Sequence, residues 1–275
     1  MLKLRIFTAL GMAVIFVICL YSFSAHIFAV ILVPLILLAG WEWSNLAGIE
    51  SAPYKSVFLL LLFSGLAIAG RSLNFFGEID LQSGQYWLIA ALGLWLVNFI
   101  FLWCYPTGSR LWSWPPILAL NGLLLLLFTW LAVVVILAQP YGDGLLFLGI
   151  GVVVFADIGG YFGGKALGKR QLAPHVSPGK TWEGFVCGLV IQIPLFVGLV
   201  LAAPSTMSAG AIALLIFPVA LISVFGDLFE SMLKRQSGLK DSSQLLPGHG
   251  GILDRIDGVM AGLPLFALLL LSWPR

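Results

Sequence analysis

Long apolar stretches, separated by short polar or glycine-containing connections, run along almost the whole chain. A helix that crosses a lipid bilayer needs roughly 20 mostly apolar residues. The stretches reach that length, and polar helix faces are missing almost throughout, so the pattern predicts an all-α, polytopic integral membrane protein with about nine transmembrane helices. Their predicted centres are Ala13, Pro34, Leu62, Leu94, Leu125, Gly151, Gln192, Ile216 and Phe266.

The composition agrees with a chain whose main solvent is lipid. Hydrophobic residues make up 60% of the 275, charged residues 9%, and the mean hydropathy is +1.06, whereas a soluble domain carries about 25% charged residues. A net charge of +2 is too small to indicate nucleic-acid binding. The three cysteines lie in or beside apolar stretches without a CxxC pair, so neither a disulfide nor a zinc site is expected.

The N-terminal stretch follows Lys3 and Arg5 and ends at residues 22–25, Ser-Phe-Ser-Ala, which faintly resemble a signal-peptide cleavage site. A second apolar stretch follows at once. We therefore interpret the first stretch as an uncleaved membrane anchor.

Positive residues are distributed unevenly among the connections. With the N-terminus in the cytoplasm, twelve of the 14 Lys and Arg residues fall on one side, and only Arg71 and Arg275 on the other. Connections rich in Lys and Arg usually face the cytoplasm. The two longest polar connections, 158–181 and 227–257, are therefore expected on the cytoplasmic face of a single membrane-embedded domain, 1–275, with the C-terminus outside.

The connection 158–181 combines glycines with cations, after an acid at the end of an apolar run. Asp157 is expected at or just inside the membrane, where a carboxylate needs a partner or a wet cavity. Glycines let backbone N–H groups approach phosphate oxygens, and ammonium groups add charge. The cations of this connection are Lys165, Lys169, Arg170 and Lys180.

These glycines allow two other interpretations. Residues 159–166 almost form a P-loop, but Ala166 replaces the required Ser or Thr and the segment follows a helix, so we reject a P-loop. Helix packing stays open, because Gly159/Gly163, Gly160/Gly164 and Gly164/Gly168 are small-xxx-small pairs. Packing alone does not explain the cations or the acid.

The connection 227–257 concentrates carboxylates at the ends of two helices. Asp227, Glu230 and Ser231 share one face of a continuing helix, and Asp254 and Asp257 share a face of the next. Carboxylates that converge at the ends of two helices suit Mg²⁺, which is coordinated by a few carboxylates together with phosphate oxygens of a substrate. Interfacial ion pairs are the alternative. His249, between two glycines, is a candidate base, phosphate donor or backbone-capping residue.

The same segment resembles the signature of the phosphatidate cytidylyltransferases, or CDP-diacylglycerol synthases. The residues that carry the resemblance are Ser231-x2-Lys234-Arg235-x4-Lys240-Asp241-x-Ser243-x2-Leu246-Pro247-x-His249-Gly250-Gly251-x2-Asp254-Arg255-x-Asp257. A second characteristic stretch of the family is matched by Ser177-Pro178-x-Lys180-Thr181-Trp182-Glu183-Gly184. The resemblance covers roughly residues 115–275, and the spans in 1–114 match only in being hydrophobic and have no assigned role.

The resemblance implies transfer of CMP from CTP to phosphatidic acid, giving CDP-diacylglycerol and pyrophosphate in phospholipid biosynthesis. It implies Mg²⁺, with a second cation left open, and the lipid bilayer as partner, without nucleic acid; a homodimer is left open. A multi-pass protein of the bacterial inner membrane, with its site facing the cytoplasm, is expected. The expected metal ligands are Asp227, Asp254, Asp257 and Asp157; the expected catalytic and phosphate-binding residues are Lys234, Arg235, Arg255, His249, Lys165, Lys169, Ser177, Lys180 and Lys240.

Two rival functions would use some of the same features. A CTP-dependent polyprenol or dolichol kinase needs the same metal, nucleotide and lipid, but the signature argues against it. A transporter usually holds its charges near the membrane midplane between inverted repeats. Here the acids gather at one face and no repeat is evident, which argues against transport.

Overall fold

The computed structural model describes residues 2–202, 208–246 and 248–272, so Pro247 and Arg275 lie outside the described residues. Helices form at all nine predicted centres. The elements in chain order are α1 (Leu2–Ser22), α2 (Ala25–Leu46), α3 (Ala52–Ser72), α4 (Leu81–Trp103), α5 (Ser109–Trp112), α6 (Pro115–Leu137), α7 (Gly142–Leu167), β1 (Gln171–Ala173), β2 (Ser177–Thr181), α8 (Trp182–Val190), α9 (Gln192–Ala202), α10 (Ala209–Gln236) and α11 (Leu253–Leu271).

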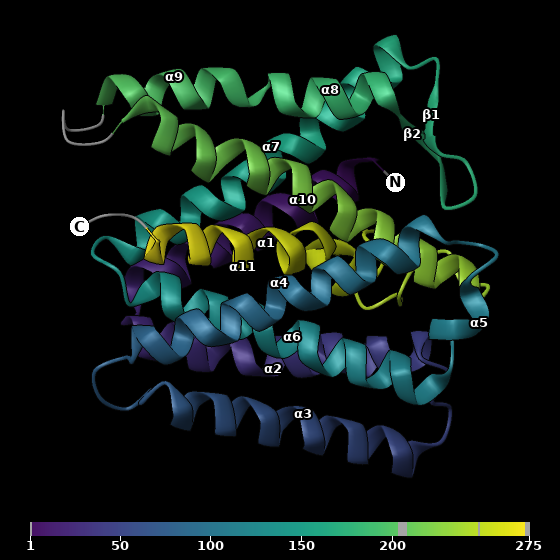
Figure 1. Cartoon of the computed structure of the whole chain (residues 1–275), viewed down its shortest axis with the longest axis horizontal. Helices are drawn as coiled ribbons and strands as arrows, with labels where there is room; N and C mark the ends of the chain where they lie inside the picture. The colour runs from purple at the N-terminus through teal and green to yellow at the C-terminus, as the bar shows by residue number, and fades with distance from the viewer. Residues whose placement is uncertain (1, 203–207, 247, 273–275) are drawn as a thin grey trace.

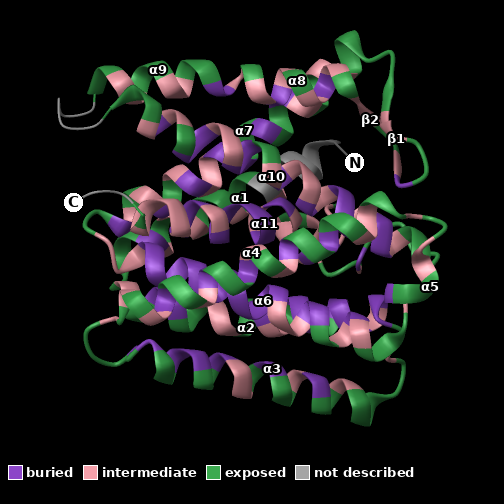
Figure 2. Cartoon of the chain, viewed as in Figure 1, coloured by how far each residue is buried: buried purple, intermediate pink, exposed green. Residues whose placement is uncertain are grey.

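The long helices lie side by side in a bundle, with α6 inside it and α3 and α9 at opposite edges (Figure 1). Helix α6 packs against α2, α3, α4, α7 and α11. It has the highest mean hydropathy of the candidate spans, and 78% of its most apolar 18-residue stretch is buried inside the bundle. The outer helices bury one side only and expose large apolar side chains on the other (Figure 2).

Seven of the described helical segments are long and apolar enough to cross a membrane, and α8 and α9 together count as one of them. In water the exposed apolar surface would be costly, whereas lipid tails solvate it. The fold is therefore that of a helical, polytopic integral membrane protein, as the hydropathy pattern predicts.

Helices α7 and α10 are longer than a membrane span requires. They contain 26 and 28 residues, so each is about 40 Å long at 1.5 Å per residue and exceeds a hydrocarbon core of about 30 Å. Residues 158–167 were expected in a polar connection and are helical instead, whereas the helix expected to continue through Asp227, Glu230 and Ser231 is confirmed. The surplus turns carry charged residues out of the apolar part of the bundle.

Two further expectations are corrected between residues 168 and 202. The all-α prediction missed a short antiparallel hairpin, β1–β2, whose second strand carries Lys180. The span near Gln192 consists of two helices, α8 and α9. Pro194 lacks the N–H that would bond to the carbonyl of Val190, where α8 ends, which accounts for the break.

The glycines of α7 pack against those of α8. A Cβ on Gly184 would lie 2.7 Å from the Gly160 carbonyl oxygen and 3.0 Å from the Gly164 Cα, and one on Gly188 would lie 2.7 Å from the Ala156 oxygen. The helix-packing interpretation of these glycines is confirmed. Close packing holds α8 along the end of α7 that carries Lys165.

The first four helices share their core with the rest of the chain. Indole N–H groups make three of the cross-links: Trp43 donates to the Leu118 carbonyl at 2.8 Å, Trp130 to that of Ala29 at 2.9 Å and Trp95 to that of Met260 at 3.1 Å. These bonds join α2 and α4 to α6 and α11. The segments 1–114 and 115–275 therefore contact each other extensively.

Candidate active site

A cavity of about 550 Å³ opens at the end of the bundle that carries the hairpin, the C-terminus of α10 and the N-terminus of α11. Its lining comes from α7, the β1–β2 hairpin, α8, α10, the connection after α10, and α11. Five acids and four cations meet in it: Asp157, Asp227, Asp241, Asp254, Asp257, Lys165, Lys180, Lys234 and Arg255. The two polar segments singled out in the sequence therefore form one site.

Asp227 and Lys180 join α10 to the hairpin. Strand β2 directs Lys180 into the cavity, where its ammonium group forms an ion pair with the Asp227 carboxylate. Both side chains are about one-quarter exposed. The Ser231 hydroxyl donates to the other Asp227 oxygen at 3.3 Å, as expected for residues one turn apart. A substrate that binds Lys180 would therefore compete with Asp227 for the ammonium group.

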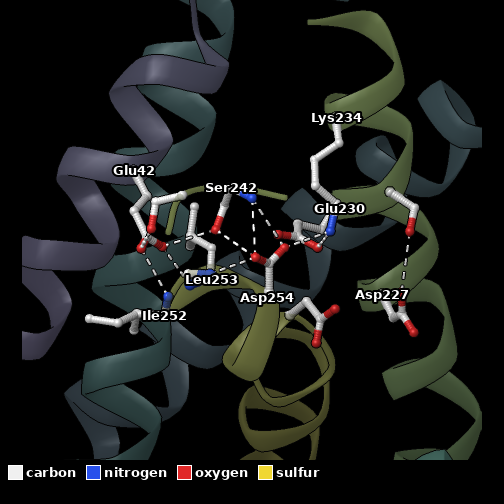
Figure 3. Close-up of polar contacts among 12 residues, drawn as sticks. Glu42, Asp227, Glu230, Lys234, Ser242, Ile252, Leu253 and Asp254 are labelled. Carbon is white, nitrogen blue, oxygen red and sulfur yellow. Dashed lines mark hydrogen bonds and ion pairs between the residues drawn. The ribbon is translucent and has the colours of Figure 1, made fainter. Parts of the chain in front are cut away.

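Lys234 lies between two carboxylates (Figure 3). Its Nζ is 2.6 Å from Glu230 Oε2 on the same helix and 2.7 Å from Asp254 Oδ1 on α11. Glu230 is completely buried, and the Lys234 side chain is only 12% exposed. Lys234 therefore links α10 to α11 and neutralises buried negative charge.

The second oxygen of Asp254 accepts from the connection that precedes α11. Oδ2 is 2.7 Å from the backbone nitrogen of Gly251, 3.1 Å from that of Ser242 and 3.1 Å from the Ser242 hydroxyl. Both Asp254 oxygens are thus occupied by donors. Gly250 beside it has φ +77°, and a Cβ there would strike the Asp254 carboxylate, so glycine is required at this position.

Asp157 and Asp257 face the same cavity from α7 and α11. Neither forms an ion pair within the described residues, and Asp257 accepts only a local 2.7 Å bond from the Gly258 N–H. With Asp227 nearby, these acids give the site negative charge that protein cations do not fully neutralise. In residues 2–202, 208–246 and 248–272, however, no three His, Cys, Asp or Glu side chains are close enough to hold a metal ion by themselves.

Two of the lining cations are available to a ligand. Lys165 and Arg255 are exposed in the cavity and form no ion pair in the part of the chain that the structure describes. The N-terminus of α8 lines the same cavity, with Thr181 as its N-cap: the Thr181 hydroxyl accepts from the Gly184 N–H at 3.1 Å. Free cations and a helix N-terminus suit an anionic ligand.

Glu183 lies just beyond this N-cap, in the first turn of α8. Its carboxylate accepts from the backbone N–H groups of Lys169 and Arg170 at 3.0 and 3.2 Å. Thr181 already caps α8, and Glu183 fixes the position of the chain where it leaves α7.

Five of the predicted site residues are not part of the cavity lining. Arg235 donates to the Val176 carbonyl at 3.2 Å and so supports the hairpin. Lys169 and Lys240 are exposed outside the lining, and Ser177 begins β2. His249 closes a turn through its backbone N–H, 2.9 Å from the Leu246 oxygen, while its Nδ1 is buried without a partner among the described residues.

Sequence reasoning missed Glu42, which lies on α2 and is completely buried. Its carboxylate accepts from the Ser242 and Ser243 hydroxyls at 3.1 and 2.5 Å and from the backbone N–H groups of Ile252 and Leu253 at 2.9 and 2.7 Å (Figure 3). The only sequence signal was an acid inside an apolar stretch, where charge is costly.

Comparison with known proteins agrees with this site. The chain matches the Cytidylyltransferase family over residues 3–273, so it belongs to that family of membrane enzymes. It is 40% identical to the phosphatidate cytidylyltransferase of Pseudomonas aeruginosa over 98% of this chain and 97% of the relative. Identity to the Haemophilus influenzae phosphatidate cytidylyltransferase is 38%, over 97% and 98% of the two chains. A Helicobacter pylori protein of the same name is 50% identical over 43% of this chain and 44% of its own.

Proposed function

We propose that the protein is a phosphatidate cytidylyltransferase, which transfers CMP from CTP to phosphatidic acid and releases pyrophosphate. The observation that carries the proposal is the mixed acidic and basic cavity at one end of the bundle, in a chain that belongs to the cytidylyltransferase family throughout its length. Two anionic substrates must approach each other there, so cations are needed, and the acids can hold a divalent ion between them.

The reaction is an in-line displacement at phosphorus. A phosphate oxygen of phosphatidic acid forms a bond to the α-phosphorus of CTP, and the bond from that phosphorus to the β-bridging oxygen breaks. A phosphomonoester is already largely ionised near pH 7, because its second pKa is about 6. The site therefore needs no strong general base, and positioning and charge stabilisation are its main tasks.

Asp157, Asp227 and Asp257 are the residues that would hold Mg²⁺. They come from three helices, line one cavity, and only Asp227 is ion-paired among the described residues. Mg²⁺ typically uses one or two carboxylates together with substrate phosphates, which fits acids that do not form a metal cage alone. When bound, the ion would neutralise charge on the pyrophosphate. Asp254, whose oxygens are already occupied, would organise the site instead.

The cations have separate tasks in this proposal. Lys165 and Arg255 face the cavity without an ion pair and would contact phosphate directly. Lys180 would move from Asp227 to phosphate when a metal ion takes its place. Lys234, held between Glu230 and Asp254, would support the site.

We also propose a multi-pass arrangement with nine spans in the inner membrane of a bacterium and the cavity open to the cytoplasm. Support comes from the excess of Lys and Arg at the end of the bundle that bears the cavity, together with the positive-inside rule. CTP would reach the cavity from the cytoplasm and phosphatidic acid from the bilayer. A homodimer stays a prediction.

The decisive assay follows label from CTP into lipid. Purified protein in detergent is incubated with phosphatidic acid, Mg²⁺ and CTP that is labelled at either the α- or the γ-phosphate. We expect α-label to enter lipid, γ-label to leave as pyrophosphate, and EDTA to abolish both. Transfer of γ-label to lipid would identify a lipid kinase and refute the proposal, as would liposome flux without any nucleotide turnover.

A further inference from the structure

Glu42 is a charged residue in the interior of the N-terminal half, and the chemistry described above does not use it. It lies on α2 near Trp43, is fully buried, and forms no ion pair within the described residues. A buried carboxylate without a cation requires several hydrogen-bond donors. Four donors surround it, and all of them belong to residues 242–253.

Two of these donors are the first free N–H groups of α11. A helix begins with N–H groups that have no partner inside the helix, and a nearby side chain usually accepts from them. Here the N-cap, Ile252, makes no side-chain cap bond of its own. The Glu42 oxygens lie 2.9 Å from the Ile252 nitrogen and 2.7 Å from that of Leu253 instead. A carboxylate at this position also interacts favourably with the helix dipole.

The other two donors are the hydroxyls of Ser242 and Ser243, and Ser242 connects Glu42 to Asp254 in the cavity. The Ser242 hydroxyl is 3.1 Å from Glu42 Oε2 and 3.1 Å from Asp254 Oδ2. It has one proton and can donate to one carboxylate at a time, so the two acids share a donor. Ser243 is 2.5 Å from Glu42 Oε1, and its hydroxyl also accepts from the Leu245 N–H at 3.1 Å.

Residue 251 lies so close to Glu42 that there is no space for a side chain at this position. A Cβ on Gly251 would lie 2.5 Å from Glu42 Oε1 and 2.7 Å from its carboxyl carbon. Gly251 in turn gives its N–H to Asp254. The position of Glu42 therefore determines where the connection ends and where the first turn of α11 begins.

We infer that Glu42 is a positioning residue for the site: α2 supplies the N-terminal cap that α11 lacks, and so fixes Asp254 and Asp257 at the cavity. The kinetic consequence of this inference rests on the proposed function. The capping of α11 by Glu42 does not depend on that function. It also gives the N-terminal spans a role, because their carboxylate holds the segment that carries the family signature.

The first test measures the cap directly. Hydrogen–deuterium exchange of peptides covering residues 250–257 is compared in the parent protein, Glu42→Gln, Glu42→Asp and Ser243→Ala. Glu42→Gln removes the charge and turns an amide NH₂ toward other donors. We therefore expect hydrogen–deuterium exchange at residues 250–257 to rise about ten- to a hundredfold. Glu42→Asp keeps a carboxylate and should recover part of the protection. Glu50→Gln, an exposed acid just beyond α2, is the matched control and should change nothing.

The second test separates positioning from substrate binding. For Glu42→Gln we expect kcat to fall about ten- to a hundredfold, the usual effect of removing a group that orients a metal-binding residue, with KM for CTP and phosphatidic acid changed less than threefold. A raised KM at unchanged kcat would overturn the inference. So would parent-like exchange at 250–257 in a folded Glu42→Gln protein.

Two controls keep the outcome decisive. If Glu42→Gln fails to fold, Ser243→Ala removes one of the four donors without burying a new group, and unchanged exchange in it overturns the inference. If the parent protein makes no CDP-diacylglycerol, the proposed function fails, yet the exchange experiment still decides whether Glu42 caps α11.

Discussion

Replacing Lys234 by Met tests whether this lysine supports the site or binds phosphate. Met fills a similar volume without charge. The ammonium group lies 2.6 Å from Glu230 and 2.7 Å from Asp254, and Glu230 is completely buried. The substitution leaves two carboxylates close together with no cation between them. One of them, Glu230, also has an oxygen without any partner in the described structure.

Removing one partner of a buried ion pair typically costs about 3–5 kcal/mol, because the remaining charge is uncompensated. The Lys234 side chain is only 12% exposed, so solvent can screen the charges little. A stability loss of 1 kcal/mol lowers the melting temperature of a domain of comparable size by about 2–4 °C. We therefore expect Lys234→Met to melt roughly 6–20 °C below the parent protein, a range obtained by multiplying these two figures.

The measurement is a thermal melt of detergent-purified protein at one fixed scan rate, since the apparent melting temperature depends on scan rate wherever unfolding is irreversible. Lys240→Met, at an exposed position outside the cavity lining, is the control and should melt like the parent. The double variant Lys234→Met/Glu230→Gln also removes the buried negative charge of Glu230 that Lys234→Met leaves without a cation, and should recover part of the lost melting temperature. A parent-like melt of Lys234→Met combined with a raised KM for CTP would refute the reasoning and make Lys234 a phosphate ligand.

Three further results are expected. Asp257→Asn keeps the size but removes the charge that a divalent cation requires, so turnover should fall by orders of magnitude and half-activation should need more Mg²⁺; a near-normal rate and Mg²⁺ response would contradict the metal assignment. Lys165→Gln should raise a substrate KM about ten- to a hundredfold, whereas Lys169→Gln, outside the lining, should not; equal effects would argue against a direct contact. A cysteine replacing Ser243 should react with impermeant thiol reagents only from the cytoplasmic side, and labelling from outside intact cells would reverse the topology.

The sequence by itself determined the class of fold and the chemical character of the site. Apolar stretches of membrane-spanning length predict helices in lipid wherever they occur, and all nine predicted centres are helical. Acids and cations are too costly inside lipid to be scattered at random, so their two clusters marked the site. Eight of the predicted site residues do line one cavity: Asp157, Asp227, Asp254, Asp257, Lys165, Lys180, Lys234 and Arg255.

Only the tertiary structure decided which charged groups pair with each other. Lys180 contacts Asp227, and Lys234 contacts Asp254, across gaps in sequence that no helical periodicity describes. Periodicity relates residues three or four apart on one helix, whereas these pairs depend on how separate helices pack. Glu42 is the clearest case: it lies about 200 positions before its partners, and only the folding of α2 against α11 brings its carboxylate to the helix end that needs it.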